Sequence, residues 1–290
     1  MSGTLRLAVV LGFLTGLWSC TTGSNDPDTG LKPTDQAELL FKSGFEGQVR
    51  LGAQIDDMVP IVGLDTETGD SWPIEILGAS GSGLHYIEDD NHRAVGSELR
   101  SVIGPYGNRT RVLYSYENRE YGESTQNPYE ILDIKEGRKD LYIKYWIKLD
   151  SSGMSAPDKW RTFFEWKTKD YEKGIGFRLI SFVYTDAQGV PYWHWQGDRD
   201  SEHPVWEIDN KQIPVPLDEW FLTEFYWHWS EGSDGRALWK VNGEVIGDHR
   251  GPTTRNSKPI DFIMLTQIYG DSNPKKQWID DIEIWDGLPE

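Results

Sequence analysis

Apolar and polar residues alternate with a period of two along most of this chain. The segment DLYIKYWIKLD (140–150) places every second residue from Leu141 to Leu149 on one apolar side. The segments WRTFFEWKT (160–168) and EWFLTEFYWHWS (219–230) follow the same pattern. Because successive side chains of a strand point to opposite faces, this pattern predicts many half-buried strands and few helices.

Turn signals between these segments favour an antiparallel arrangement. Asn242-Gly243 separates two short strand-like runs in RALWKVNGEVIGD (236–248), which is a strong hairpin signal. The closing segments DFIMLTQIYGD (261–271) and QWIDDIEIWDG (277–287) also alternate. Helical periodicity is limited to short turns, such as one over 34–41. The sequence therefore predicts an all-β fold, an antiparallel β-sandwich of the jelly-roll type.

The N-terminus has the features of an export signal. Arg6 precedes an apolar run, 7–18, that is too short to span a bilayer comfortably. Cys20, the one cysteine of the chain, ends the stretch LWSC, which resembles a bacterial lipobox. We expect a signal peptide at 1–19, a lipidated Cys20 with a flexible tether to residue 36, and a single domain at 37–290. The alternative is a signal peptide in which Cys20 is incidental.

These features predict a monomeric lipoprotein of the bacterial outer membrane or cell surface, with its domain in the periplasm or outside the cell. The lipid would be its one attachment to the membrane. The formal net charge of −18 opposes binding to phosphate backbones, so nucleic acid is excluded as a partner. Fourteen Trp and thirteen Tyr favour a carbohydrate partner, because sugar rings offer apolar faces with polar edges.

Several of these segments resemble the concanavalin-A-like jelly-roll superfamily. They are KDLYIKYWIKL, FFEWKT, YWHWQGD, PLDEWFLTEFYWHWSEGSDGRALWKVNGEVI and WIDDIEIWDG. Within that superfamily they are most similar to polysaccharide lyases related to heparin lyase I and glucuronan lyase, over about residues 40 to 288. The resemblance implies a jelly roll that acts on or binds polysaccharide. The same frame also carries lectins, glycosidases and non-catalytic binding domains.

A second resemblance is local. GSELRS (96–101) is similar to the R-(S/T)-E-L-R strand of alginate lyases, although Val95 and Gly96 stand where its leading arginine would be. The resemblance implies that Arg100 helps to neutralise a substrate carboxylate and that Glu98 lies beside it. A fainter match of LTQIYGD to another strand of that branch implies a site role for Tyr269.

The stretch PYWHWQGD (191–198) places three polar side chains on one face, with Trp193 and Trp195 behind them. A lyase that cleaves a uronate by β-elimination needs a base, an acid and a group that offsets the carboxylate. We predict His194 as the base, Tyr269 as the acid, and Arg100 with Gln196 at the carboxylate. His194 as a hydrogen-bonded structural residue is the alternative.

Further residues are predicted to bind the acidic polysaccharide, with His228 as a reserve base. The set is Tyr192, Arg161, Glu98, Gln267, Glu165 and His228. Strict alternation places Arg161, Glu165 and Lys167 on one strand face. Two other functions stay open: a non-catalytic carbohydrate-binding lipoprotein, and a glycosidase that would pair Glu165 with Glu224.

The predicted reaction requires no cofactor, although a structural Ca²⁺ is conceivable. The resemblance implies such an ion between the first and last strands, with Glu46, Asp280 and Asp281 as candidate ligands. Strict alternation places Asp281 on the face of Ile279 and Asp280 on the face of Ile282. The alternative is that Asp280 and Asp281 are solvated acids of the last strand that bind no ion.

Overall fold

The computed structural model describes most of the segment 37–289. The described ranges are 37–53, 58–72, 82–85, 95–117, 129–132, 138–168, 171–199, 203–255, 260–267, 270–272 and 274–289. The predicted signal peptide, Cys20 and tether lie outside these ranges. Within them, no helix is long and apolar enough to cross a bilayer.

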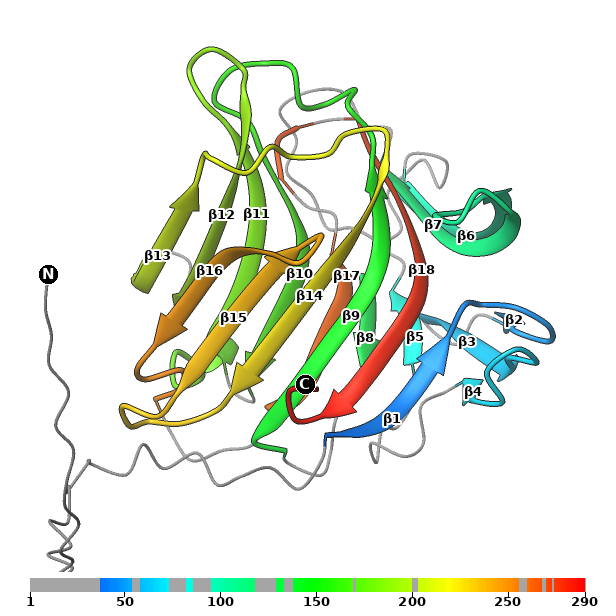
Figure 1. Cartoon of the computed structure of the whole chain (residues 1–290), viewed down its shortest axis with the longest axis horizontal. Coiled ribbons are helices and arrows are strands. Elements are labelled where there is room, and N and C mark those ends of the chain that lie inside the picture. Colours follow the sequence, from blue (N-terminus) through cyan, green and yellow to red (C-terminus); the bar gives the residue numbers. More distant parts are fainter. Residues whose placement is uncertain are drawn as a thin grey trace, which may run out of the picture. The chain divides into compact units, whose positions relative to one another are not determined.

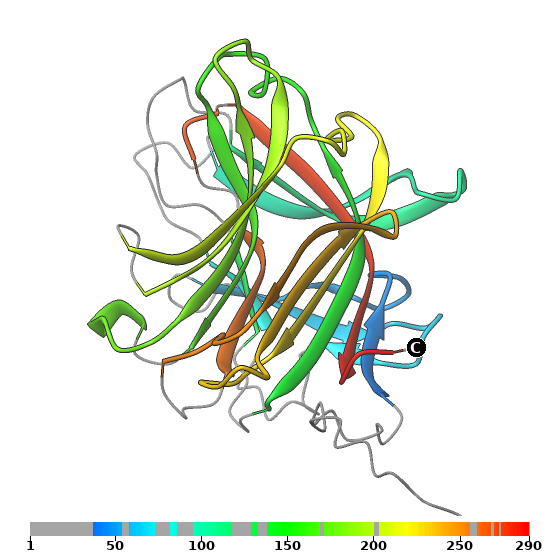
Figure 2. The same ribbon diagram turned by 60° about the vertical axis from the view of Figure 1, so that its left-hand side comes forward.

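Two antiparallel sheets form the fold (Figures 1 and 2). The eight-stranded sheet has the order β16 (Glu244–Arg250), β15 (Arg236–Val241), β14 (Trp220–His228), β9 (Asp140–Leu149), β18 (Lys275–Asp286), β7 (Arg109–Glu117) and β6 (Val95–Ile103), and β1 (Glu38–Ser43) also pairs with β18. The prediction of an all-β antiparallel sandwich is confirmed.

The ten-stranded sheet lies opposite. Its order is β13 (Pro204–Asn210), β12 (Pro191–Asp198), β11 (Arg178–Thr185), β10 (Trp160–Thr168), β17 (Ile260–Gln267), β8 (Tyr129–Leu132), β5 (Ser82–His85), β3 (Met58–Leu64) and β2 (Arg50–Leu51), and β4 (Ser71–Trp72) pairs with β3. A short 3₁₀ helix, η2 (Tyr171–Lys173), follows β10.

Aromatic side chains from both sheets meet in the core. Phe164 of β10 stacks on Phe225 of β14 with ring centres 4.0 Å apart and planes 9° apart. Trp166 and Trp227, two positions further along the same strands, stack with centres 5.3 Å apart. The apolar residues of the alternating segments are thus the ones that hold the two sheets together.

The Asn242-Gly243 hairpin is confirmed. Asn242 and Gly243 connect β15 to β16 with φ angles of 50° and 80°. Positive φ at both central positions is the requirement of a type I′ turn, whose twist matches that of the paired strands. By contrast, the helical turn expected at 34–41 is wrong for its described part, because Glu38–Ser43 pairs with β18 as a strand.

Two bulges change which residues share a face. In β10 the register with β11 shifts between Thr162 and Phe164, so Arg161 points into the sandwich while Glu165 points out of it. The prediction that Arg161 shares a face with Glu165 and Lys167 is therefore wrong. An inserted residue reverses the parity of a strand, and composition alone does not reveal it.

The second bulge is in β18. Its register with β9 shifts between Asp280 and Glu283, and Asp281 takes a left-handed φ of 48°. As a result Ile279 and Ile282 both lie in the core. The strict alternation predicted for this strand is wrong for the same physical reason.

We predict that Phe225→Ala lowers the free energy of unfolding by about 3–5 kcal/mol, because it removes the ring that stacks on Phe164 and leaves a cavity between the sheets. Urea unfolding measures this change. Val190→Ala, at an exposed position, serves as the control and is expected to change the free energy by less than about 0.5 kcal/mol. Equal effects of the two substitutions would contradict this account of the core.

Candidate functional site

The outer face of the ten-stranded sheet carries the polar side chains of β12. Trp193 and Trp195 are buried in the core, and Tyr192, His194 and Gln196 lie on the opposite face. This shared face agrees with the alternation of PYWHWQGD. The face continues onto the neighbouring strands through the register of β12 with β11 and with β13, which is regular from Trp193 to Gly197 and shifts with β13 only after Gly197.

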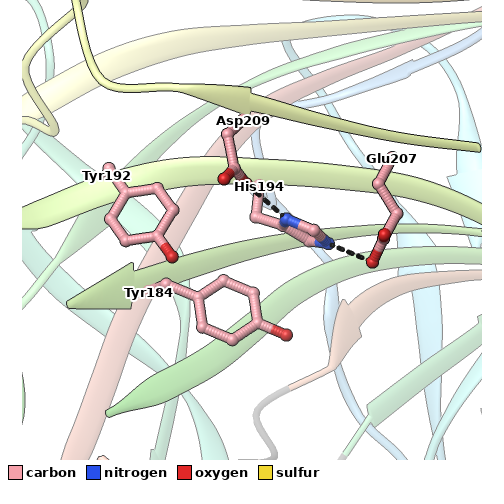
Figure 3. Close-up of a pocket in the computed structure, with 5 residues that line it drawn as sticks. All are labelled: Tyr184, Tyr192, His194, Glu207 and Asp209. Carbon is pink, nitrogen blue, oxygen red and sulfur yellow. Dashed lines mark hydrogen bonds and ion pairs between the residues drawn. The ribbon is translucent and has the colours of Figure 1, made fainter. Parts of the chain in front are cut away.

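A depression of about 370 Å³ lies on this face (Figure 3). Its lining consists of Tyr184 from β11, Tyr192 and His194 from β12, and Glu207 and Asp209 from β13. The ring centres of Tyr184 and His194 are 4.8 Å apart, and those of Tyr184 and Tyr192 are 5.8 Å apart. One imidazole, two phenols and two carboxylates therefore meet in one open hollow.

His194 is held from both ring nitrogens. Its Nδ1 lies 2.7 Å from Asp209 Oδ1, and its Nε2 lies 3.0 Å from Gln196 Oε1. Glu207 Oε1 is 3.7 Å from the same Nε2. All three partner atoms are oxygens that can accept hydrogen bonds, so both ring nitrogens have a partner and the ring is fixed in orientation.

A chain of buried polar contacts fixes Gln196. Its Nε2 donates to Asp198 Oδ2 at 2.7 Å, which turns its carbonyl oxygen toward His194. Asp198 also accepts from Arg178 Nη2 at 2.7 Å and from the Tyr171 hydroxyl at 2.6 Å. Gln196 is 7% exposed and His194 is 8% exposed, so both lie low in this face of the sheet. The contact of Gln196 with a substrate carboxylate stays a prediction.

The two phenols are held in the protonated form. Burial, followed by the nearby Tyr192 and Glu207, raises the pKa of Tyr184 to about 12. Burial, followed by the charge of Asp209, also raises the pKa of Tyr192. A raised pKa keeps a phenol protonated at neutral pH, so the proton is present, and it also makes the phenol a weaker acid.

Arg100 and Glu98 do not belong to this site. Both lie on β6 of the eight-stranded sheet, where Arg100 Nε donates to Glu98 Oε1 at 2.6 Å. Their predicted role at the substrate carboxylate beside His194 is wrong, because the local resemblance of GSELRS gave no information on which sheet takes the strand. Tyr269 and the side chain of Gln267 lie outside the described residues.

Arg161 and Glu165 are not open to substrate either. Arg161 is 1% exposed, and its Nη2 donates to Gln277 Oε1 of the other sheet at 2.9 Å. Glu165 is fully buried and pairs with Lys167 at 2.8 Å. Their predicted substrate contacts are wrong. The proposed pairing of Glu165 with Glu224 also fails, because the two residues belong to different sheets.

His228 lies on the outer face of the eight-stranded sheet and cannot replace His194 in the depression. Its Nδ1 is 2.8 Å from Asp140 Oδ1, which also accepts from the Tyr226 hydroxyl at 2.6 Å. The hydrogen bond with Asp140 raises the pKa of His228 against burial, which acts to lower it. Burial acts to raise the pKa of Asp140, but the bonds from His228 and Tyr226 outweigh it and lower that pKa.

Sequence reasoning missed Tyr184, Glu207 and Asp209. The segment RLISFVYT (178–185) has apolar residues on both faces, so the sequence did not indicate that Tyr184 faces solvent. The acids of PVWEIDN (204–210) alternate with apolar residues, which is a usable signal for a strand with a polar face. Their neighbourhood with His194 follows from the register of β12 with β13.

The three candidate calcium ligands lie near one another. A side chain at Gly44 would come within 3.0 Å of Asp281 Oδ1 and 3.6 Å of Asp280 Oδ1, so both carboxylates converge there. Burial and then Asp281 raise the pKa of Asp280 to about 8. Glu46, however, already accepts bonds from Thr110 Oγ1 and the Arg111 main chain.

Among the described residues, no group of three His, Cys, Asp or Glu side chains is arranged to hold a metal ion. Calcium takes six to eight oxygen ligands, and two converging carboxylates would have to be joined by main-chain or water oxygens. The chemistry of Asp280 and Asp281 suits such a hard cation. The calcium ion stays a prediction.

Comparisons with solved structures show the fold of this chain. The alginate lyase Aly36B, as a double mutant with an alginate trisaccharide, aligns over 86% of this chain and 98% of its own, with a TM-score of 0.54 and 12% identity. Another Aly36B structure aligns over 67% of this chain and 84% of its own, with a TM-score of 0.51 and 14% identity. The endo-β-1,4-glucuronan lyase of the fungus Trichoderma reesei aligns over 71% of this chain and 94% of its own, with a TM-score of 0.50 and 10% identity.

These proteins are polysaccharide lyases, and their likeness to this chain is one of fold. No family model matches the sequence, and no curated protein is similar to it.

We predict that the His228–Asp140 contact stabilises the fold in a pH-dependent way. Because the pKa of His228 is raised in the fold, its contribution is complete below its ordinary pKa of 6.5 and is lost as the pH rises through the raised value. Unfolding free energies of wild type and His228→Gln, measured from about pH 5 to pH 9, should therefore converge as the pH rises.

His249 supplies a control of opposite sign. Burial lowers the pKa of His249, so the fold favours the neutral ring. The unfolding free energy of wild type should therefore rise relative to that of His249→Gln as the pH rises. The same pH trend for both substitutions would contradict these assignments.

We predict that millimolar Ca²⁺ raises the thermal midpoint of the wild-type protein by about 5 °C, because an ion that binds only the folded state stabilises it. Asp280→Asn should remove the increment, whereas Asp286→Asn, at the far end of the same strand, should keep it. A wild-type midpoint that does not respond to Ca²⁺ would exclude the ion.

Proposed function

We propose that this protein is a polysaccharide lyase that cleaves an acidic, uronate-containing polysaccharide by β-elimination in the depression of β11, β12 and β13. The observation that carries the proposal is the contact of His194 with Tyr184, ring centres 4.8 Å apart, on an open sheet face. A base and an acid on adjacent strands are the two groups that the reaction needs.

In the proposed reaction, His194 removes the proton from the sugar carbon next to the carboxylate group. The electron pair of that C–H bond forms a carbon–carbon double bond, and the bond to the glycosidic oxygen breaks. The Tyr184 hydroxyl gives its proton to the departing oxygen. The products are an unsaturated uronate and a new free sugar hydroxyl, without oxidant or cofactor.

The contacts of His194 support its role as the base. Asp209 beside Nδ1, and Gln196 with Glu207 beside Nε2, stabilise the positive charge that the ring gains when it accepts the proton. Gln196 acts as a positioning residue, because its amide is fixed by Asp198. The raised pKa of Tyr184 keeps its hydroxyl protonated, and its ring lies beside His194, so we assign it the role of the acid in place of the predicted Tyr269.

Two side chains at the rim are proposed to bind the sugar. Tyr192 is half-buried and offers a ring face, and the Lys211 ammonium lies 4.4 Å from the centre of that ring. A cation at this place would pair with the uronate carboxylate, which makes the adjacent C–H more acidic. We therefore assign to Lys211 the neutralisation of the substrate carboxylate that was predicted for Arg100.

We also propose that the domain is displayed by a lipid on Cys20 at the outer membrane or cell surface, as a monomer. The stretch LWSC after an apolar run supports this proposal. Export would bring the domain to large polysaccharides, which do not cross membranes.

A second function, carbohydrate binding without catalysis, is favoured by one observation. The side chains of Glu207 and Asp209 at the rim are 52% and 49% exposed, and their charges repel a polyanion. A neutral glycan would not meet this repulsion.

We predict that His194→Gln and Tyr184→Phe each lower kcat on a uronate polysaccharide by about 10²-fold or more, because each removes a proton-transfer group. The ultraviolet absorbance of the unsaturated product measures the rate. His228→Gln is the matched control, since it makes the same substitution on the other sheet, and it should keep the wild-type rate.

Full activity of His194→Gln would contradict the assigned base. New reducing ends without ultraviolet absorbance would indicate a hydrolase. Absence of any cleavage of uronates, together with retention of the protein by a neutral glycan, would establish the binding function instead.

A further inference from the structure

A row of aromatic and basic side chains crosses the outer face of the eight-stranded sheet, on the opposite side of the fold from the depression. Its members are Trp220 of β14, Lys148 of β9, Trp278 of β18, Tyr114 of β7 and Arg100 of β6. These five strands are consecutive neighbours in the sheet (Figure 1). We call this row the outer ladder.

Register places the ladder straight across the strands. Trp220 is opposite Lys148, Lys148 is opposite Trp278, and Trp278 is opposite Tyr114. On β6, the next strand, Glu98 is opposite Tyr114, and Arg100 lies two residues further along the same strand. Strands lie about 4.8 Å apart, so the part of the ladder from Trp220 to Trp278 spans about 10 Å. The end of β6 bends back toward β14, where the Ile103 carbonyl accepts from the Trp220 indole.

Each member of the ladder touches the next. The Lys148 ammonium is 5.7 Å from the ring centre of Trp220 and 4.5 Å from that of Trp278. The rings of Trp278 and Tyr114 have centres 5.0 Å apart, and the Arg100 guanidinium lies 3.7 Å above Tyr114. These contacts hold the side chains in one continuous surface.

Four of the five ladder members reach solvent, and Tyr114 is buried beneath Arg100. Trp220, Lys148 and Trp278 are half-buried, and Arg100 is exposed. The indole N–H of Trp220 donates to the Ile103 carbonyl at 3.1 Å, which fixes the ring. Core packing does not account for these positions, because the core lies on the other face of the same strands.

We propose that the outer ladder is a second polysaccharide-binding site, which holds one chain of an acidic polysaccharide away from the catalytic depression. Trp220 and Trp278 would stack on sugar rings, and Lys148 would pair with a uronate carboxylate. The ligand class rests on the proposed lyase function, whereas the binding surface itself does not.

The spacing of the ladder fits a linear polymer. Trp220 and Trp278 are two strands apart, about 10 Å, which is comparable with the length of a disaccharide. The cation between them, Lys148, would face the carboxylate of the intervening residue. In a protein with a net charge of −18, a local row of cations and aromatic rings is the kind of surface that a polyanion can still bind.

The charge is not cancelled along the whole ladder. Glu98 forms an ion pair with Arg100, so that end is balanced. Lys148 lies opposite the two tryptophans in the described strands, and neither strand partner is an acid. Lys148 is therefore the residue on which selectivity for an acidic chain depends.

The two faces allow separate tests. A short oligosaccharide bound in the depression does not at the same time contact the ladder on the opposite sheet, so its turnover does not depend on the ladder. The first experiment measures the retention of the His194→Gln protein in a native gel that contains polyuronate, so that cleavage does not destroy the ligand. We expect Lys148→Gln or Trp278→Ala in this background to weaken polymer binding about fivefold or more.

Lys240→Gln is the matched control. It makes the same substitution on the outer face of the same sheet, on β15, away from the ladder. It should leave retention unchanged. Retention of a neutral glycan should be unaffected by Lys148→Gln, and the difference between wild type and Lys148→Gln on polyuronate should shrink at high salt.

The second experiment measures turnover of a short uronate oligosaccharide by Lys148→Gln and Trp278→Ala with His194 intact. Unchanged turnover with weakened polymer retention supports the ladder. Equal retention of the Lys148→Gln and Lys240→Gln proteins by polyuronate would overturn it, whatever the result for Trp278→Ala. If the lyase proposal is wrong, the wild-type protein will not turn over the oligosaccharide. Retention of the protein by the polyuronate gel would still test the ladder in that case.

Discussion

The burial of Trp193 and Trp195 between the two sheets is the constraint on which the site depends. Because β12 alternates without a register shift up to Gly197, fixing these two rings in the core forces Tyr192, His194 and Gln196 onto the outer face. The register with β11 and β13 then brings Tyr184 and Asp209 beside His194. A slip of one residue in β12 would bury the imidazole and expose the tryptophans, so the aromatic core and the site are specified together.

The site combines a rigid base with an open rim. Beside His194, the amide of Gln196 is bound to Asp198, which is itself held by Arg178 and by Tyr171 of η2. Fully satisfied buried networks of this kind fix side-chain orientation. Above it, the rim acids and phenols face solvent around a hollow of about 370 Å³. The proposed proton transfer at a bound sugar requires both features, a fixed base and access from solvent.

The fold was predictable from the sequence because its signals are local. The alternating segments, the Asn242-Gly243 turn and the aromatic core positions each follow from short stretches. The site was predictable only in part. The shared face of Tyr192 and His194 depends on one strand, whereas the burial of Arg161 depends on a bulge and the place of Arg100 depends on which sheet takes β6. Tyr184 and Asp209 become site residues through pairing between strands, which a single sequence does not reveal.

The central claim is that the protein breaks a glycosidic bond by elimination. The most direct test is the mass of the products that the wild-type protein forms from a uronate oligosaccharide of defined length in ¹⁸O-labelled water. Elimination predicts fragments whose masses add up to that of the substrate, with no label taken up during bond cleavage. Fragments that together exceed the substrate by one labelled water would contradict elimination and identify the protein as a hydrolase.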